Sequence, residues 1–346
     1  MRLHEDWPAA RDRLTALWRG ERLDRPCMAV TAPAERPPDP VPPPPSAEAR
    51  WLDPSWVPRA ARASIEGRWW GGESVPSFLL MAGWVVCLGG TPRFADDTIW
   101  FEDAAPDFDS PPPWRHDEND PWVARHRAVY EAMAREAGWD DFLLGSPLLL
   151  PACDLLSMHM GATRFLTALL DHPDWMRAAI LQGADGIVQA RSALRAHVEE
   201  RHAYWYGNAG WMPFWAPEPF FTTQSDVSCM LSPGMFEAFV LPELEAYHRA
   251  FGPVWYHLDG CDATQHLPCL LSLPWIRVVQ YTPTPAEPPN GPEHLPLYRR
   301  IQSAGKIVHI AVAPEAVAPL RAVLDPSLLM LDVACASVED ARRLLA

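Results

Sequence analysis

The chain has 346 residues, about half of them hydrophobic, which is enough to bury a substantial core and excludes wholesale disorder. Its 44 acidic residues outnumber the 29 basic ones and give a net charge of −15, so nucleic acids and anionic lipid surfaces are disfavoured as partners. No apolar run reaches the roughly 18 residues of a membrane helix, and the N-terminus lacks the apolar core of a signal peptide. We therefore expect a cytoplasmic protein.

The first predicted element is an amphipathic helix from Trp7 to Arg19, with Leu14, Leu17 and Trp18 at helical spacing. A short β-type run follows at residues 25–31. Residues 33–45 are so rich in proline that they must form a loop or a polyproline II segment. We interpret residues 1–346 as one domain that carries this N-terminal helix and a proline-rich surface loop.

Beyond the loop, strand-like runs alternate with helical stretches. With residues 25–31, the strand-like runs number eight, the others being 98–101, 142–145, 203–206, 254–257, 276–281, 307–312 and 328–333. The main helical stretches are 162–170, 173–198, 233–251, 263–272, 295–304, 314–324 and 338–345. Apolar strands that alternate with helices indicate a parallel sheet covered on both faces. Eight such units predict an α/β fold of the (β/α)₈ TIM-barrel type, with a doubly wound sheet as the alternative.

Three side chains of metal-ligand type lie at the end of the predicted strand 254–257, namely His257, Asp259 and Cys261. Histidine and thiolate are the favoured zinc donors, and a carboxylate is acceptable. Cys335 could supply a fourth ligand if the strand that precedes it approaches across the mouth of the barrel. The alternative is that His257 forms hydrogen bonds within the barrel, Cys261 packs in the core and Asp259 caps the next helix.

Further candidates lie at strand ends or in loops. Asp97 belongs either to a site or to a solvated turn, and Asp226 lies too far before the helix that starts near residue 233 to cap it. With Gln280 and His257, they make up our candidate catalytic residues. His309 lies inside a strand, where a core histidine is expected. Four aromatic residues could bind a substrate, namely Trp205, Trp211, Tyr256 and Tyr281. The alternative is that they pack in the core.

Several segments resemble the uroporphyrinogen decarboxylase superfamily, which includes the zinc-dependent methylcobamide:coenzyme M methyltransferases. The segments that carry the resemblance are Asp226–Pro233, Phe236–Pro242 and Tyr256–Gly260, and those similar to uncharacterised bacterial members are Leu23–Pro26, Asp97–Glu102 and Tyr298–Lys306. The resemblance implies a (β/α)₈ barrel. In the methyltransferases a His-x-Cys pair and a later cysteine hold zinc; His257 matches the first ligand, Asp259 stands at the second, and Cys335 lies close to the third.

The resemblance thus implies a zinc-dependent methyl or one-carbon transferase that acts on a small thiol or a corrinoid-linked substrate, with a corrinoid protein as partner. It does not extend to the arginine-rich loop of the decarboxylases, because residues 31–36 contain only Arg36. One alternative is a metal-independent decarboxylase or other lyase that uses Asp97 or Asp226 and His257. Another alternative is a barrel that has lost catalysis and serves as a binding or scaffold protein. The lyase would be favoured by a pocket surrounded by Arg93, Arg164 and Arg277.

Overall fold

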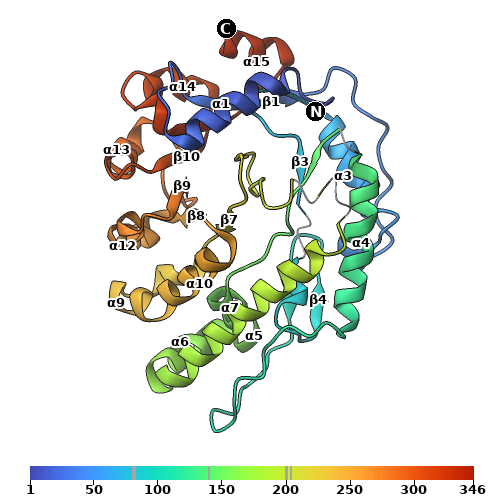
Figure 1. Cartoon of the computed structure of the whole chain (residues 1–346), viewed down its shortest axis with the longest axis vertical. Coiled ribbons are helices and arrows are strands. Elements are labelled where there is room, and N and C mark those ends of the chain that lie inside the picture. Colours follow the sequence, from blue (N-terminus) through green and yellow to red (C-terminus); the bar gives the residue numbers. More distant parts are fainter. Residues whose placement is uncertain (80–82, 139–140, 199–201, 203–204) are drawn as a thin grey trace.

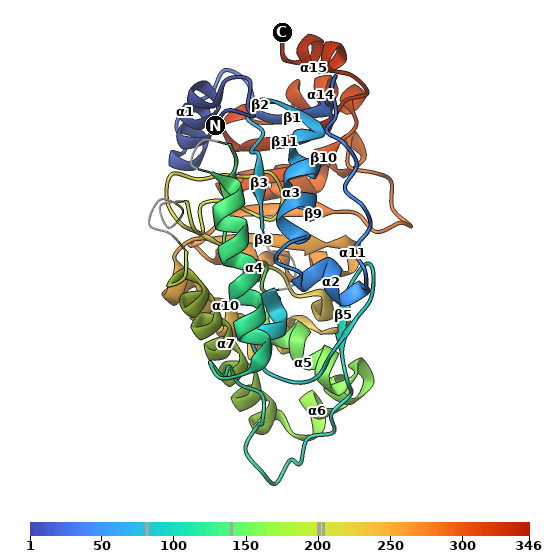
Figure 2. The same cartoon turned by 90° about the vertical axis from the view of Figure 1, so that its right-hand side faces the viewer.

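The computed structural model describes residues 1–79, 83–138, 141–198, 202 and 205–346. Its centre is a seven-stranded sheet with the order β2-β1-β11-β10-β9-β8-β7, in which only the pair β1–β2 is antiparallel. Figure 2 shows the strands from β1 to β8 stacked below one another. Their bounds are β1 Cys27–Pro33, β2 Arg68–Gly72, β7 Phe221–Thr223, β8 Val254–Asp259, β9 Ile276–Thr282, β10 Ile307–Val312 and β11 Leu329–Ala334.

Helices connect and cover these strands. Those of the C-terminal half lie along one side of the molecule in Figure 1, where α10, α12, α13 and α14 follow one another beside the strands. Their bounds are α9 Pro233–Met235, α10 Leu241–Phe251, α11 Gly260–Ala263, α12 Leu267–Ser272, α13 Leu295–Ser303, α14 Pro314–Arg321 and α15 Val338–Leu345. The helix predicted over residues 233–251 is interrupted by a π-helical turn, Phe236–Val240, just before Pro242 at the start of α10.

The N-terminal half contributes further helices, and α1 has the bounds that the sequence predicts. These helices are α1 Trp7–Arg19, α2 Ala47–Leu52, α3 Val57–Glu66, α4 Pro121–Ala137, α5 Ala152–Met160, α6 Ala162–Asp171 and α7 Pro173–Arg195. Asp6 caps α1 by accepting a hydrogen bond from the Ala9 N–H group, and Gly20 ends it with a φ of 72°. In the described part of the chain, no helix is both long and apolar enough to cross a membrane.

A parallel α/β sheet is confirmed, but the closed eight-stranded barrel is not. Among the described residues, β3 (Ser77–Phe78) pairs only with β6 (Leu143–Leu144), and β4 (Pro92–Phe94) pairs only with β5 (Ile99–Phe101) in an antiparallel hairpin. The strand predicted at 203–206 is wrong at Trp205 and Tyr206, which lie in a turn, and its residues 203–204 fall outside the described residues. The sheet therefore ends at β2 and β7.

The sheet buries a different core on each face. The face we call inner carries Trp255, Val278 and Met330 and packs against α1 and the segment 214–220. The face we call outer carries Tyr256 and Leu331 and packs against the surrounding helices. Because consecutive strand residues point to opposite faces, residues 255, 257 and 259 belong to the inner face.

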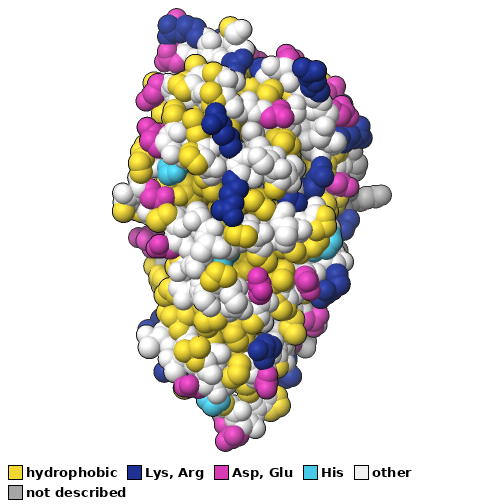
Figure 3. All heavy atoms as spheres, turned by 90° about the vertical axis from the view of Figure 1, so that its left-hand side faces the viewer, with side chains coloured by type: hydrophobic (Ala, Val, Ile, Leu, Met, Phe, Trp, Pro, Cys, Tyr) yellow, Lys and Arg dark blue, Asp and Glu magenta, His cyan; other side chains and the backbone are white. Residues whose placement is uncertain are grey.

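The outer helices present a mixed surface to solvent. Figure 3 shows the side of the molecule that lies on the left in Figure 1, with acidic and basic side chains scattered among apolar ones. The convergence of polar groups that concerns function is instead found at the carboxyl ends of the strands.

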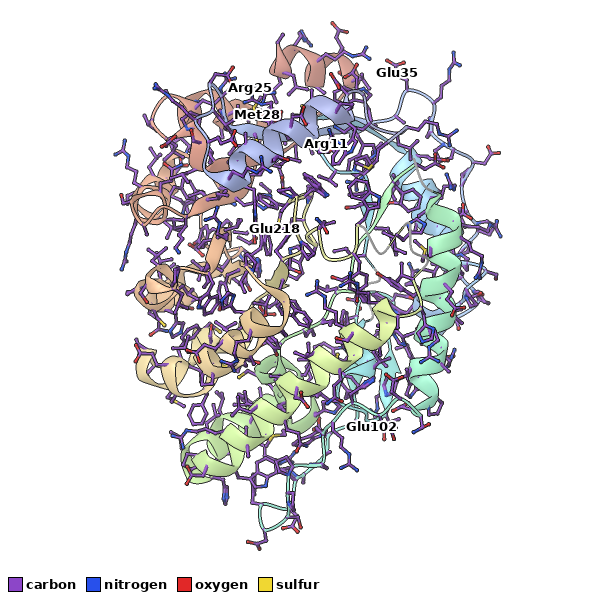
Figure 4. All side chains as sticks on the ribbon, in the orientation of Figure 1. Arg11, Arg25, Met28, Glu35, Glu102 and Glu218 are labelled. Carbon is purple, nitrogen blue, oxygen red and sulfur yellow. The ribbon has the colours of Figure 1, made fainter. Side chains whose placement is uncertain are left out.

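A buried carboxylate joins α1 to the start of the sheet. Glu73 is 1% exposed and accepts hydrogen bonds from both terminal nitrogens of Arg25, at 2.8 and 2.9 Å, and from the Met28 N–H group at 2.7 Å. The Arg13 Nε atom lies 3.2 Å away. Arg25 and Met28 are labelled beside α1 in Figure 4. Two arginines thus compensate the one buried charge, which fixes α1 on β1.

Candidate functional site

Three ligand-type side chains meet where β7 and β8 end. One atom each from Asp226, His257 and Asp259 lies within 4.8 Å of the other two. Asp226 opens the 3₁₀ turn Asp226–Met230 that follows β7, while His257 and Asp259 are alternate residues of β8. Parallel neighbours end at one edge of the sheet, and alternate residues share a face, so this geometry follows directly from the strand pattern. We call these residues the Asp-His-Asp cluster.

A glycine allows the chain to leave β8 directly after Asp259. Gly260 has a φ of 72°, and a Cβ atom there would lie 2.3 Å from Thr284 Cγ2. Only glycine adopts this conformation at no steric cost, so α11 can begin at once. The Cys261 N–H group donates to Glu287 at 3.0 Å, and the Cys261 side chain is exposed.

The tautomer of His257 is set by Gln280 on the neighbouring strand. The two residues are register partners, and His257 Nδ1 donates to Gln280 Oε1, while Gln280 Nε2 donates to Thr282 at 2.9 Å. His257 Nε2 therefore presents a lone pair, and it lies 4.0 Å from Asp259 Oδ1. Burial lowers the pKa of His257 and outweighs Gln280 and Asp259, which raise it. A neutral imidazole held by an outer partner is typical of metal-binding histidines.

Asp226 is held in place by a residue that the sequence analysis missed. Asp154 of α5 is buried and accepts hydrogen bonds from the N–H groups of Asp226 and Val227 at 3.0 and 3.1 Å. Gln224 donates to Asp226 Oδ2 at 2.7 Å. A signal was present, because Asp154 is the one acid in the apolar run 152–156.

The carboxylates of the site repel one another. Solvent reaches the Asp226 side chain, yet surrounding protein atoms desolvate its carboxylate, which raises its pKa, and the charges of Asp154 and Asp259 raise it further. Burial likewise raises the pKa of Asp154. Within the described ranges, no arginine or lysine pairs with Asp226 or Asp259. A bound cation would relieve this repulsion.

Two cavities lie near the cluster, one lined by Asp226 and the other by Trp211, which contacts His257. The first, of about 510 Å³, opens over the ends of β1, β10 and β11, and Trp211 lines it. The Trp211 ring is centred 4.9 Å from the His257 ring, so this tryptophan connects the cavity to the cluster. The second, of about 430 Å³, is lined by Asp226 and Asp154 and by Trp100 and Met230, whose side chains are more than half exposed. Both volumes suit small organic molecules.

The structure does not bring every predicted binding residue to the cluster. Tyr256 and Tyr281 belong to the outer face, where both are buried against helices. Trp205 packs against Trp215 at a ring distance of 6.3 Å, and Asp97 lies on the exposed turn between β4 and β5. Of the four predicted aromatic residues, Trp211 is the one that contacts His257.

The cysteines also lie apart from the Asp-His-Asp cluster. Cys335 is buried in the core of the outer face, and its N–H group donates to the Thr31 carbonyl oxygen at 2.8 Å. Cys261 is exposed on α11. Burial raises the pKa of the Cys335 thiol, which disfavours the thiolate that zinc binds. Asp226 thus stands with His257 and Asp259 in the position that we expected a cysteine to hold.

Three arginines that would have favoured a lyase are engaged elsewhere. Arg93 pairs with Glu102 at 3.2 Å on the β4–β5 hairpin. Arg164 donates to the Met160 carbonyl oxygen at 2.5 Å, and Arg277 donates to that of Trp18. They form no group around either cavity beside the cluster.

Gln280, the hydrogen-bond partner of His257, offers a test of the cluster. Replacing Gln280 by leucine removes the acceptor that orients His257, so we expect affinity for Zn²⁺ to fall by roughly 10- to 100-fold. Isothermal titration of the metal-free protein measures the change. The matched control is Gln265→Leu, an exposed glutamine on the turn after α11. Equal affinities for Gln280→Leu and wild type would show that Gln280 does not orient a ligand.

Comparisons with known proteins identify a solved structure with a similar fold. No family model matches the chain, and no curated protein has a significantly similar sequence. Among solved structures, a methyltransferase from Methanosarcina mazei is similar over 97% of both chains, with a TM-score of 0.58 and 11% sequence identity. At this identity, the likeness shows a shared fold.

Proposed function

We propose that this protein is a zinc-dependent methyltransferase that moves a methyl group from a corrinoid-linked donor to a small thiol. The observation that carries the proposal is the Asp-His-Asp cluster, with its ligand atoms within 4.8 Å of one another and two cavities nearby. A transferase must seat a donor and an acceptor near one reactive centre, and two cavities meet that need. The fold shared with a solved methyltransferase supports the same reaction class.

The donor set fits zinc. Imidazole nitrogen and carboxylate oxygen both bind Zn²⁺, and catalytic zinc sites use three protein ligands and leave a fourth position open. The two carboxylates of Asp226 and Asp259 would also be neutralised by a divalent cation. This set is harder than one with thiolates, so we expect it to accept Mn²⁺ or Co²⁺ as well.

Zinc, when bound here, would lower the pKa of a thiol and so favour the nucleophilic thiolate. The protein's own groups prepare the site. Gln280 keeps the His257 Nε2 lone pair available, Asp154 holds the turn that carries Asp226, and Trp211 forms an apolar wall of the first cavity beside His257. In the proposed transfer, the thiol would release its proton to solvent, its sulfur would bond to the methyl carbon, and the carbon–cobalt bond of the donor would break with both electrons left on the corrinoid.

The second cavity suits the donor. Trp100 and Met230 are 56% and 53% exposed, respectively, at its lining, which is unusual for side chains of this size and polarity. An apolar rim of this kind suits a macrocycle or the protein that carries it. The first cavity, whose lining includes Asp332 and Arg68, is then left for the acceptor.

Methylcobalamin provides the test. Protein loaded with Zn²⁺ is mixed with methylcobalamin and 2-mercaptoethanol, 3-mercaptopropionate or cysteamine, and the loss of the methyl–cobalt absorbance and the methyl thioether product are followed. We expect transfer at least about tenfold faster than with metal-free protein, since removal of a thiolate-stabilising centre costs this much or more. His257→Ala should match the metal-free rate, and replacement of the exposed Asp262 of α11 by alanine should match wild type. Equal rates with and without zinc for all three thiols would contradict the proposal.

A further inference from the structure

The first cavity contains a carboxylate whose position is set by a chain of hydrogen bonds. Trp255 Nε1–H donates to His309 Nδ1 at 3.0 Å, so His309 carries its proton on Nε2 and donates it to Asp332 Oδ2 at 3.0 Å. His309 was expected to be a core histidine, and both of its nitrogens are indeed paired within the inner face. Asp332 belongs to β11, points to the same inner face and lines the cavity.

The other oxygen of Asp332 lacks a partner. The side chain is only 11% exposed. Its Oδ1 atom is buried, yet it accepts no hydrogen bond from the part of the chain that the structure describes. A buried carboxylate oxygen left unpaired is costly, and such groups call for an explanation. Since the residue lines an open cavity, the fitting explanation is a ligand that donates a hydrogen bond to this carboxylate.

A positive charge lines the same cavity. Arg68 of β2 is exposed, and in the described ranges it forms no ion pair, either with Asp332 or with another acid. An arginine and an aspartate that face one cavity without meeting each other can each hold one end of a ligand with two opposite charges. Trp70 and Trp211 also line this space and provide aromatic faces that attract a cation.

We propose that the first cavity binds a small zwitterion, whose protonated amine donates to the Asp332 carboxylate and whose own carboxylate, or other anionic group, binds Arg68. This rests on the proposed function only in naming that cavity as the seat of the acceptor substrate. The binding itself requires none of the three cluster residues. His309 acts as a positioning residue, because it holds Asp332 Oδ2 and thereby fixes the carboxylate at the wall of the cavity.

The test uses the metal-free full chain and ω-amino acids of increasing length: glycine, β-alanine, 4-aminobutyrate and 5-aminopentanoate. Butylamine and butyrate, each with one of the two charges, serve as references. Dissociation constants are measured by ligand-observed NMR. We expect at least one ω-amino acid to bind at least tenfold more tightly than both references.

Substitutions then assign the two ends. Asp332→Asn places an amide at the amine end, and Arg68→Gln removes the positive charge at an exposed position where folding is not at risk. Each should weaken the binding of the best ω-amino acid at least tenfold, while Arg59→Gln, an exposed arginine of α3 outside the cavity, should not. Failure of every ω-amino acid to bind, equal binding of the references, or an unchanged dissociation constant for Arg68→Gln would overturn the proposal.

The two proposals can fail separately. If ω-amino acids bind as described but methylcobalamin is not demethylated, the assignment of methyl transfer falls and the zwitterion site stands. If the methyl is transferred but the Arg68 and Asp332 variants bind the probes like wild type, the zwitterion site falls and the transferase stands.

Discussion

Replacing His257 by alanine is expected to weaken Zn²⁺ binding more than Gln280→Leu does, that is, by more than the roughly 10- to 100-fold predicted for the loss of a residue that orients a ligand. His257 supplies the single nitrogen ligand of the cluster. Its hydrogen bond to Gln280 already leaves the lone pair of His257 Nε2 available to a metal held by the two carboxylates. Without the imidazole, only two monodentate oxygens remain. Titration against a chelator of known affinity measures the change.

The cysteines give the decisive controls for this prediction. Asp226→Ala and Asp259→Ala should weaken Zn²⁺ binding to a similar extent, while Cys261→Ser and Cys335→Ser should leave it unchanged. The reverse pattern, with zinc lost on removal of Cys335 and retained without Asp226, would contradict the carboxylate site. It would return the ligand set to the cysteines that the sequence predicts.

Glu243→Gln is expected to remove a large pH dependence of stability. Glu243 of α10 is fully buried, and it accepts hydrogen bonds from the Ala152 N–H group at 2.7 Å and the Tyr247 hydroxyl at 3.1 Å. Its Oε1 atom is buried without a hydrogen-bond partner in the described part of the chain. Burial, reinforced by the charge of Asp154, raises the pKa of Glu243 from 4.5 to about 8.

The sign follows from the raised pKa. Between these two values the folded state keeps a proton that the unfolded state releases, so the free energy of unfolding falls as pH rises through the interval. For a fully buried group the loss between pH 5 and pH 8 is about 3 kcal/mol. Glutamine keeps the acceptor oxygen and cannot ionise, so the variant should lose this slope and be the more stable protein at pH 8.

Urea unfolding at pH 5 and pH 8 measures the effect. Glu237→Gln, an exposed glutamate on the π-helical turn before α10, should keep the slope of the wild type. Parallel pH profiles for wild type and Glu243→Gln would show that Glu243 is ionised in the folded protein at both pH values.

The strands of the C-terminal half could be predicted because they are long and apolar on both faces. The runs at residues 254–257, 276–281, 307–312 and 328–333 became β8, β9, β10 and β11 within a few residues. The short strands β5 and β6 lie within the runs predicted at residues 98–101 and 142–145, but β3 has only two residues and β7 has three, two of them threonines. The sequence around β3 and β7 shows no hydrophobic period to detect, since their pairing depends on distant segments.

The site was predictable at its centre and not at its edges. His257 and Asp259 were predicted as ligands because polar residues at the ends of parallel strands gather at one edge, whereas Asp226 was predicted as a catalytic residue and not as a ligand. Cys335 failed to join them because side chains alternate along β11 and beyond it: Asp332 points to the inner face and Cys335 to the outer core. Asp332 itself carried a signal, as the one acid in the apolar strand 329–334.

The most direct test of the metal centre is a crystal structure of the protein grown with Zn²⁺, with data collected on both sides of the zinc absorption edge. We predict an anomalous peak within about 2.0–2.2 Å of His257 Nε2 and of one carboxylate oxygen each from Asp226 and Asp259. A peak bonded to Cys261 or Cys335, or no peak at the Asp-His-Asp cluster at saturating Zn²⁺, would contradict the account.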